Sequence, residues 1–149
     1  MDMENVITWA VPDVKMTHGR RRPDFGSDDG FTASWWGEHA DFGPPDHQWR
    51  SYSQNGEQVA RLLLSLRFPS HANLPVPAVM VWNFEVRQDL QRNGAHIGST
   101  IVAELSAEFQ DLEIYIGPTS DSIDFWKQFR WPMCDCDECN DHDFIVRRP

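Results

Sequence analysis

The segment 79–100 limits the fold more than any other part of the chain, because a short loop with glycine joins two different hydrophobic periodicities there. Residues 79–87 alternate between apolar and polar side chains, which predicts a β-strand. Residues 98–109 carry apolar side chains at helical spacing, which predicts an amphipathic helix. The first N–H groups of a helix are unpaired and carry the positive end of its dipole. A strand that leads into such a helix start therefore predicts a site for a phosphorylated ligand, and Gly94 and Gly98 let the backbone approach it.

The composition is that of one folded domain. A chain of 149 residues can bury most of its apolar surface, and seven Trp and nine Phe supply large core side chains. Residues 6–11 are too short, and too closely flanked by acids, to be a secretory signal. No apolar run approaches the roughly 20 residues of a membrane-spanning helix. We therefore expect a cytoplasmic protein with no membrane partner.

The net charge of −10 argues against nucleic acid as a partner, because phosphate contacts need a basic face. The cluster Arg20, Arg21 and Arg22 is the exception, and we interpret it as a solvated loop. The acidity suits a cationic or amine-bearing substrate, and it equally suits simple solubility.

The same periodicity arguments place the remaining elements. Expected strands are 6–11, 58–68, 79–87, 112–116 and 144–147, and expected helices are 34–41, 98–109 and 120–129. On the strand 79–87 we expect Met80, Trp82, Phe84 and Val86 to share one face. Residues 12–33 are rich in Pro, Gly and Asp and are expected to be loop. This order predicts an α/β (α+β) domain with helices packed on a mixed sheet.

The second half, roughly residues 56–131, resembles the GCN5-related N-acetyltransferase (GNAT) superfamily. Residues 85–94, EVRQDLQRNG, are similar to the family's fourth strand and its Arg/Gln-x-x-Gly-x-Gly/Ala pyrophosphate loop. Residues 97–102, IGSTIV, are similar to the start of the next helix. Residues 112–119 resemble the fifth strand and its loop. Residues 125–131, FWKQFRW, resemble the Phe-Tyr-x-x-x-Gly-Phe end of the helix that follows.

The resemblance implies a mixed, mostly antiparallel sheet of about six to seven strands flanked by about four helices. It implies one domain over residues 1–149, with an acceptor-side region at about 1–55, an acetyl-CoA core at about 56–131 and a Cys-rich segment at 132–149. The implied activity is transfer of an acetyl group from acetyl-CoA to a primary amine of a small molecule or a protein.

The resemblance also implies how coenzyme A is held. Backbone N–H groups in the loop and helix start face the pyrophosphate, Arg87 or Arg92 pairs with a phosphate, and hydroxyls stand at the helix start. Backbone groups near Phe84 bind the pantetheine amides, and one N–H polarises the thioester carbonyl. The implied contacts are Phe84, Val86, Arg87, Gln91, Arg92, Asn93, Gly94, Ala95, His96, Ile97, Gly98, Ser99 and Thr100.

Two positions depart from the family pattern. In the simplest register His96 stands where the middle glycine of the loop belongs; alternatively, Ala95 and His96 are a two-residue insertion. Trp126 stands where many members carry the Tyr that protonates the leaving thiolate. An indole N–H is a hydrogen-bond donor but not a usable acid at neutral pH, so another acid, water or none would serve.

The candidate catalytic residues are Glu85, Tyr115 and Trp126. Glu85 is the first choice for the base, because a carboxylate on that strand can reach the amine directly or through water; a surface or salt-bridged Glu is the alternative. Tyr115, on the neighbouring strand, is the fallback phenol for the thiolate, with core packing as the alternative. The resemblance places Glu38, His39 and Asp41 in the acceptor-binding region, where a plain surface helix is the alternative.

A second candidate site lies near the C-terminal end, where Cys134, Cys136, Cys139 and His142 have the spacing Cys-x-Cys-x₂-Cys-x₂-His. Three thiolates and an imidazole suffice for one tetrahedral, structural Zn²⁺. The alternatives are three reduced thiols in an acidic loop, or a hard cation held by Asp135, Asp137 and Glu138. An odd, clustered set of cysteines is a poor disulfide framework.

Two other function classes stay open. One is a non-catalytic relative that binds acyl-CoA or acts through protein contacts, which His96 and Trp126 both favour. The other is a zinc-stabilised binding module that is similar to the family in architecture only. A homodimer is also left open.

Overall fold

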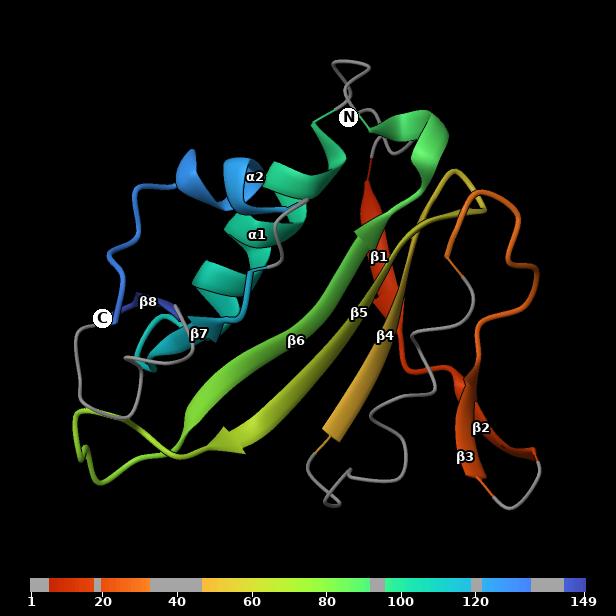
Figure 1. Ribbon diagram of the computed structural model, residues 1–149. Helices are drawn as coiled ribbons and strands as arrows, with labels where there is room; N and C mark the ends of the chain where they lie inside the picture. Colours follow the sequence, from red (N-terminus) through yellow and green to blue (C-terminus); the bar gives the residue numbers. More distant parts are fainter. Residues whose placement is uncertain (1–5, 18–19, 33–46, 92–95, 119–121, 135–143) are drawn as a thin grey trace.

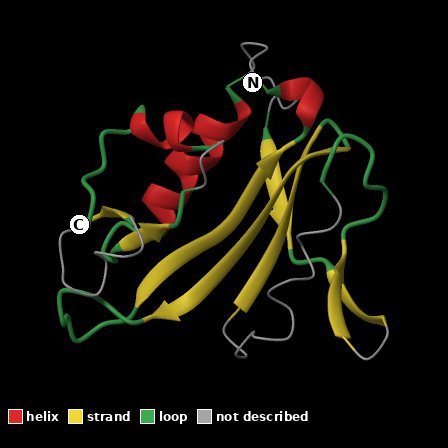
Figure 2. Ribbon diagram, in the orientation of Figure 1, coloured by secondary structure: helices red, strands yellow, loops and turns green. Residues whose placement is uncertain are grey.

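The computed structural model describes residues 6–17, 20–32, 47–91, 96–118, 122–134 and 144–149 (Figures 1 and 2). In chain order the elements are β1 (Ile7–Ala10), β2 (Asp13–Thr17), β3 (Arg20–Asp24), β4 (His47–Gln54), β5 (Glu57–Phe68), β6 (Ala78–Val86), the 3₁₀ helix η2 (Gln88–Leu90), α1 (Ile97–Glu108), β7 (Ile114–Ile116), α2 (Ile123–Lys127) and β8 (Ile145–Arg147). Neither of the two α-helices in these ranges has the length and apolar character needed to cross a bilayer.

Six strands form one mixed sheet in the order β1-β4-β5-β6-β7-β8, and β2 and β3 form a separate hairpin. Every neighbouring pair in the large sheet is antiparallel except β6 and β7, which run parallel. This confirms the expected mixed, mostly antiparallel sheet. Figure 1 shows α1 and α2 packed together over β6 and β7, and the β2–β3 hairpin standing apart beyond β4.

The expected number of helices was too high for the residues that the structure describes. They hold two α-helices and one short 3₁₀ helix instead of about four helices. The expected helix 34–41 lies outside the described ranges. The segment 12–33 was expected to be loop, yet it contains the β2–β3 hairpin, in which Val14 is opposite Pro23. Turn-forming residues obscure the strand pattern here, and among the described residues these two strands pair with each other.

The sheet buries a core on its helix side. Apolar side chains of α1 at helical spacing, Ile97, Ile101, Val102 and Leu105, pack against Leu62 and Leu64 of β5 and Val79 and Val81 of β6. An ion pair also ties α1 to β4, because the buried Arg50 donates to both carboxylate oxygens of the exposed Glu108 at 2.8 and 2.7 Å. The ring of Trp9 on β1 lies 3.7 Å from that guanidinium carbon. These contacts fix the position of α1 across β4 and β5.

A β-bulge at Trp82 corrects the expected face pattern of β6. Leu64 is opposite Val81 and Leu63 is opposite Asn83, so Trp82 is an extra residue in β6. Met80 and Trp82 pack on the face opposite the helices, whereas Phe84 and Val86 pack in the core beneath α1 and α2. The four residues therefore do not share one face, because an inserted residue reverses the alternation of a strand.

Candidate functional site

The parallel pairing of β6 with β7 ends halfway along β6. Pairing covers only Val79 to Val81, opposite Ile114 to Ile116. On its other edge, β6 stays paired with β5 as far as Val86. Within the described ranges, the β7-side edge of β6 is therefore without a partner strand over residues 82–86.

The bulge decides which backbone groups this open edge presents. Before it, Val79 donates its N–H to Glu113, next to β7, at 2.9 Å. After it, Arg87 donates its N–H to Val59 of β5 at 2.9 Å. Because a strand alternates its hydrogen-bonding edges, Phe84 and Val86 turn their N–H and C=O groups toward the open edge. The side-chain amide of Gln91 donates to the Val86 carbonyl at 2.6 Å. An extended, amide-bearing ligand could pair here as a strand does.

The start of α1 lies beside this edge. The N-cap residue is His96, with φ +54° and ψ +30°, and no described side chain caps the helix. The N–H of Thr100 donates to the His96 carbonyl at 3.0 Å. The amides of Ile97, Gly98 and Ser99 precede the first intrahelical bond, so they are free to face an anion. The left-handed backbone of His96 is the conformation that glycine adopts most readily, which fits the middle-glycine position of the loop pattern.

Gly98 is the point where α1, α2 and β6 meet. A β-carbon on Gly98 would lie 2.8 Å from Cε1 of Phe125 on α2 and 3.5 Å from Cγ2 of Val86. The expected helix 120–129 is observed as α2, Ile123–Lys127. After α2, Arg130 has φ +58°, at the position where the family pattern has glycine. The absence of a side chain at Gly98 thus lets α2 pack directly on the first turn of α1.

Trp126 is a core residue beside the open edge. It is 4% exposed, and its ring centroid lies 6.0 Å from that of Phe84 and 5.0 Å from that of Phe125. Trp126 thus packs against β6 on the side of the sheet that the helices cover, as the resemblance implies. Its indole cannot serve as a proton donor to a thiolate.

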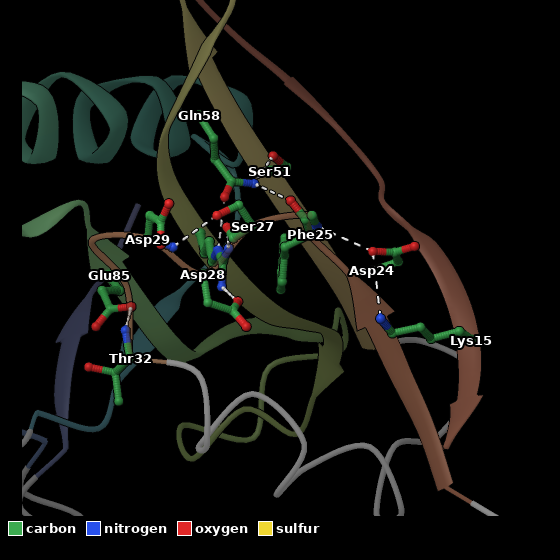
Figure 3. Close-up of polar contacts among 12 residues, drawn as sticks. Lys15, Asp24, Phe25, Ser27, Asp28, Asp29, Thr32, Ser51, Gln58 and Glu85 are labelled. Carbon is green, nitrogen blue, oxygen red and sulfur yellow. Dashed lines mark hydrogen bonds and ion pairs between the residues drawn. The ribbon is translucent and has the colours of Figure 1, made fainter.

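Glu85 lies on the opposite face of the sheet from the helices, as Figure 3 shows together with the loop that covers it. It is half-buried and stands across from Arg61 of β5. Its Oε1 accepts a hydrogen bond from the backbone N–H of Thr32 at 2.9 Å. The ion pairs of the described residues do not include Glu85. Its carboxylate is thus oriented by a neutral donor rather than neutralised by a cation.

Tyr115 occupies a different polar network. It is fully buried and pairs with Met80, before the bulge. Its hydroxyl accepts from the N–H of His71 at 2.9 Å and donates to Glu113 Oε1 at 3.2 Å. Glu113 is also buried and accepts from Arg148 at 3.2 Å. Burial raises the pKa of Tyr115 above its ordinary value. The hydroxyl proton of Tyr115 is thus already donated to Glu113, on the face of the sheet opposite α1 and α2.

Arg87 makes its contacts away from the start of α1. Its guanidinium donates to Asp89 at 2.6 and 3.1 Å and to the Gln58 carbonyl at 2.9 Å. The hydrogen bond to Asp89 raises the pKa of Arg87. An open pocket of about 490 Å³ surrounds this group and is lined by Asp29, Gly30, Glu57, Arg87, Gln88 and Asp89. Of the other implied coenzyme contacts, Arg92, Asn93, Gly94 and Ala95 lie outside the described residues.

The cysteine site is described only in part. Cys134 is buried, and its backbone N–H donates to the Phe144 carbonyl at 2.7 Å. Cys136, Cys139 and His142 lie outside the described residues, as do Glu38, His39 and Asp41 of the expected acceptor region. The described part of the chain holds no cluster of three His, Cys, Asp or Glu side chains suited to a metal. The zinc site stays a prediction.

Sequence reasoning missed the loop over Glu85 and the arginine that anchors it. A charged side chain on a strand is most often exposed, yet Arg61 on β5 is 1% exposed. The only local signal is that Arg61 and Glu85 lie on two strands that follow each other in the sequence. Their link through residues 27–32 is non-local.

Known proteins resemble this chain in fold but not in sequence. No protein-family model matches the sequence, and no curated protein is similar enough to count as a match. The N-acetyltransferase YlbP of Bacillus subtilis, solved in complex with coenzyme A, matches 68% of this chain and 67% of its own, with a TM-score of 0.53 and 18% identity. An acetyltransferase from Thermus thermophilus matches 74% of this chain and 70% of its own, with a TM-score of 0.55 and 14% identity.

A third structure extends the match over nearly the whole chain. A mutant of the AtaT toxin, bound to the C-terminus of the antitoxin AtaR, matches 95% of this chain and 91% of its own, with a TM-score of 0.55 and 14% identity. At such identities the likeness concerns the fold. With the six-stranded mixed sheet, the half-paired parallel strands and the helix start beside them, the chain has the fold of the GCN5-related N-acetyltransferase superfamily.

Proposed function

We propose that the protein is an N-acetyltransferase that moves the acetyl group of acetyl-CoA to a primary amine by direct attack. The observation that carries this proposal is the open edge of β6 beside the uncapped start of α1. A β-carbon on Gly98 would lie 3.5 Å from Cγ2 of Val86, so the two features are adjacent. Structures of the same fold hold coenzyme A, which supports the choice of ligand.

Each half of this site suits one part of acetyl-CoA. The amides of Ile97, Gly98 and Ser99 would donate to the pyrophosphate, which is anionic and suits the positive end of a helix. Phe84 and Val86 would pair with the pantetheine amides along the open edge. The carbonyl of Val86 would then exchange its bond with Gln91 for one with the ligand, at little net cost, because one hydrogen bond replaces another.

In this proposal Glu85 is the base. An amine nitrogen that attacks the thioester carbon must lose a proton, and a carboxylate within reach accepts it. Thr32 holds Oε1 of Glu85 at 2.9 Å, and no described group donates to Oε2, which is therefore the oxygen that takes the proton. Because Glu85 and α1 lie on opposite faces of the sheet, the amine would arrive from the loop side and the coenzyme from the helix side.

The leaving thiolate does not need Tyr115. A thiol has an ordinary pKa of about 8.5, so its thiolate can leave and take a proton from water near neutral pH. Trp126 cannot supply a proton. Tyr115 donates its own to Glu113. We therefore propose water as the proton source, with Tyr115 as the alternative that mutation can test.

The test is release of free thiol from acetyl-CoA in the presence of a panel of amines: a small primary amine, a polyamine, an aminoglycoside and a lysine peptide. We expect thiol release with at least one of them. Glu85→Gln should lower kcat by about 10²- to 10⁴-fold, because it removes the base, and leave the KM for acetyl-CoA unchanged. Asp111→Asn, at an exposed carboxyl distant in sequence from the site, is the matched control. An undiminished kcat in Glu85→Gln would reject that residue as the base.

A second candidate is a non-catalytic acyl-CoA-binding protein. The burial of Trp126 at the acid position favours it, since the side chain serves the core rather than the reaction. Such a protein would be stabilised by acetyl-CoA in a thermal melt and would release no thiol with any amine. The two measurements together separate the two candidates.

A further inference from the structure

A loop formed by residues 25–32 covers the face of β5 and β6 that is opposite the helices (Figure 3). It follows β3 and carries no secondary structure beyond turns. Two side chains beneath it matter most: Arg61 in the middle of β5 and Glu85 on β6, which stand directly across from each other. We call this segment the 25–32 loop.

Arg61 anchors the loop from inside the protein. It is 1% exposed, and its guanidinium donates to Asp28 Oδ1 at 2.7 Å, to the Ser27 carbonyl at 2.7 Å and to Gln58 Oε1 at 3.0 Å. The rings of Phe25 and Phe31 lie 4.7 and 4.2 Å from its central carbon. A buried cation is tolerated only when it is paired and hydrogen-bonded, and here the loop supplies both the pair and the stacking.

Further hydrogen bonds hold the loop between Asp28 and Thr32. Within it, the N–H of Phe31 donates to the Asp28 carbonyl at 2.9 Å. The Gly30 carbonyl accepts from the N–H of Gln88, beyond β6, also at 2.9 Å. Gly30 has φ +82°, and a β-carbon on it would lie 2.6 Å from Cγ of Arg87, so the loop sits tightly on the end of β6. The result is a Thr32 N–H that points at Glu85 Oε1.

Arg61 forms its ion pair with Asp28 of the loop, whereas Glu85 accepts a hydrogen bond from the neutral N–H of Thr32. The ion pair of the described residues that involves Arg61 joins it to Asp28, whose side chain is 54% exposed. Glu85, although it stands directly opposite, receives a neutral donor. A base that must accept a proton would be weakened by a direct cation partner, because a cation stabilises the carboxylate. Among the described residues, the Thr32 N–H orients Glu85 without such an ion pair.

We propose that Arg61 is a positioning residue: it fastens the 25–32 loop so that the Thr32 N–H fixes the orientation of the Glu85 carboxylate. This rests on the proposed function, in which Glu85 Oε2 accepts the proton of the attacking amine. A misplacement of a reacting group by about 1 Å can cost about 100-fold in rate, so a loosened loop has a measurable consequence.

The first test is a double-mutant cycle between Arg61 and Glu85. We expect Arg61→Met to lower kcat by about 10- to 100-fold and to leave the KM for acetyl-CoA unchanged. In a Glu85→Gln background, the same change should lower kcat no further, because its effect passes through Glu85. Arg67→Met, which removes an exposed arginine from the same strand, is the matched control. Additive losses in the double variant would overturn the proposal while leaving the role of Glu85 intact.

A second pair of variants covers the case in which Arg61→Met does not fold. Thr32→Pro removes the N–H donor itself, and Thr32→Ala retains it and reports the contribution of the side chain. We expect kcat to fall at least tenfold more in Thr32→Pro than in Thr32→Ala, with equal affinity for coenzyme A by calorimetry. Equal kcat values in the two variants would overturn the proposal.

Amide hydrogen exchange separates this proposal from the proposed function. We expect the Thr32 amide to be protected in the wild-type protein and to exchange at least tenfold faster in Asp28→Asn and in Glu85→Gln. A Thr32 amide whose exchange does not respond to Asp28→Asn would overturn the anchoring of the loop. Absence of thiol release by the wild-type protein with every amine would instead reject the proposed function, and the positioning role with it.

Discussion

Gly98, in the first turn of α1, packs so closely on Phe125 of α2 that a β-carbon on it would lie 2.8 Å from Cε1 of that ring. The same glycine is adjacent to Val86 at the open end of β6. The helix start that would receive the pyrophosphate and the strand edge that would receive the pantetheine are thus held together at one residue that has no side chain.

Replacing Gly98 with alanine should therefore destabilise the protein. Alanine gains up to about 1 kcal/mol in helix propensity, but overpacking against Phe125 costs about 1 to 3 kcal/mol. We expect a net loss of about 1 kcal/mol in the free energy of unfolding, measured with urea. Combining Gly98→Ala with Phe125→Leu should recover part of it. Gly117→Ala is the control, since its nearest neighbour is 3.4 Å away. A stability gain in Gly98→Ala alone would show that the contact is not tight.

Exchanging His96 tests its left-handed backbone. His96 has φ +54°, which costs a residue with a β-carbon about 1 to 2 kcal/mol and costs glycine little. We expect His96→Gly to be about 1 kcal/mol more stable than His96→Ala in urea unfolding, because only the first relieves the strain. Equal stability of the two variants would mean that His96 is not left-handed in solution.

Tyr115 should contribute to stability rather than to turnover. Tyr115→Phe leaves the His71 N–H and Glu113 without one partner, which costs about 1 to 3 kcal/mol. We expect kcat to change less than twofold in this variant, whereas a loss of tenfold or more would make Tyr115 the acid after all.

The raised pKa of Tyr115 also predicts a pH dependence with a definite sign. Burial keeps the phenol protonated in the folded state above the pKa of about 10 that it has in the unfolded chain. Its contribution to stability is therefore fully present below pH 10 and is lost as the pH rises through the higher folded-state pKa. We expect the free energies of unfolding of wild type and Tyr115→Phe, measured with urea, to differ less at pH 11 than at pH 8.

The predicted zinc site can be tested by metal analysis of the purified protein. We expect about one zinc per chain, lost in Cys136→Ser, because three thiolates and one imidazole complete a tetrahedral site. Cys134 is buried next to the sheet, so a metal there would tie the segment before β8 to the core. Protein without bound metal would end this interpretation.

The elements that the sequence predicted well are those whose side chains obey one simple periodicity. β5 has apolar residues at every second position on the helix side, and α1 has an apolar stripe, so both were located to within a residue or two. The strand β4 was missed because Arg50, buried against Glu108, breaks the apparent alternation that Tyr52 would otherwise support. Pairing with a distant acid is not visible in a local pattern.

In the candidate site, too, local patterns were predictable and contacts between distant residues were not. The strand, the helix start and the family spacing were sufficient to predict the mixed sheet and the position of Glu85 on the strand β6. The bulge at Trp82 was not predictable, since it depends on how Leu63 and Leu64 pair across the sheet, and it reverses the face of every later residue of β6. The contact between Thr32 and Glu85 joins residues 53 apart, which no periodicity encodes.

The most direct measurement is titration of the protein with coenzyme A in a calorimeter. We expect one binding site with an affinity in the micromolar range, about −8 kcal/mol, since amides of α1 and the edge of β6 are both available. Gly94→Trp should abolish the heat of binding without lowering the melting temperature, because a large side chain in the loop before α1 blocks the phosphates. A folded wild-type protein that gives no heat with coenzyme A would show that the start of α1 and the edge of β6 do not form a coenzyme A site.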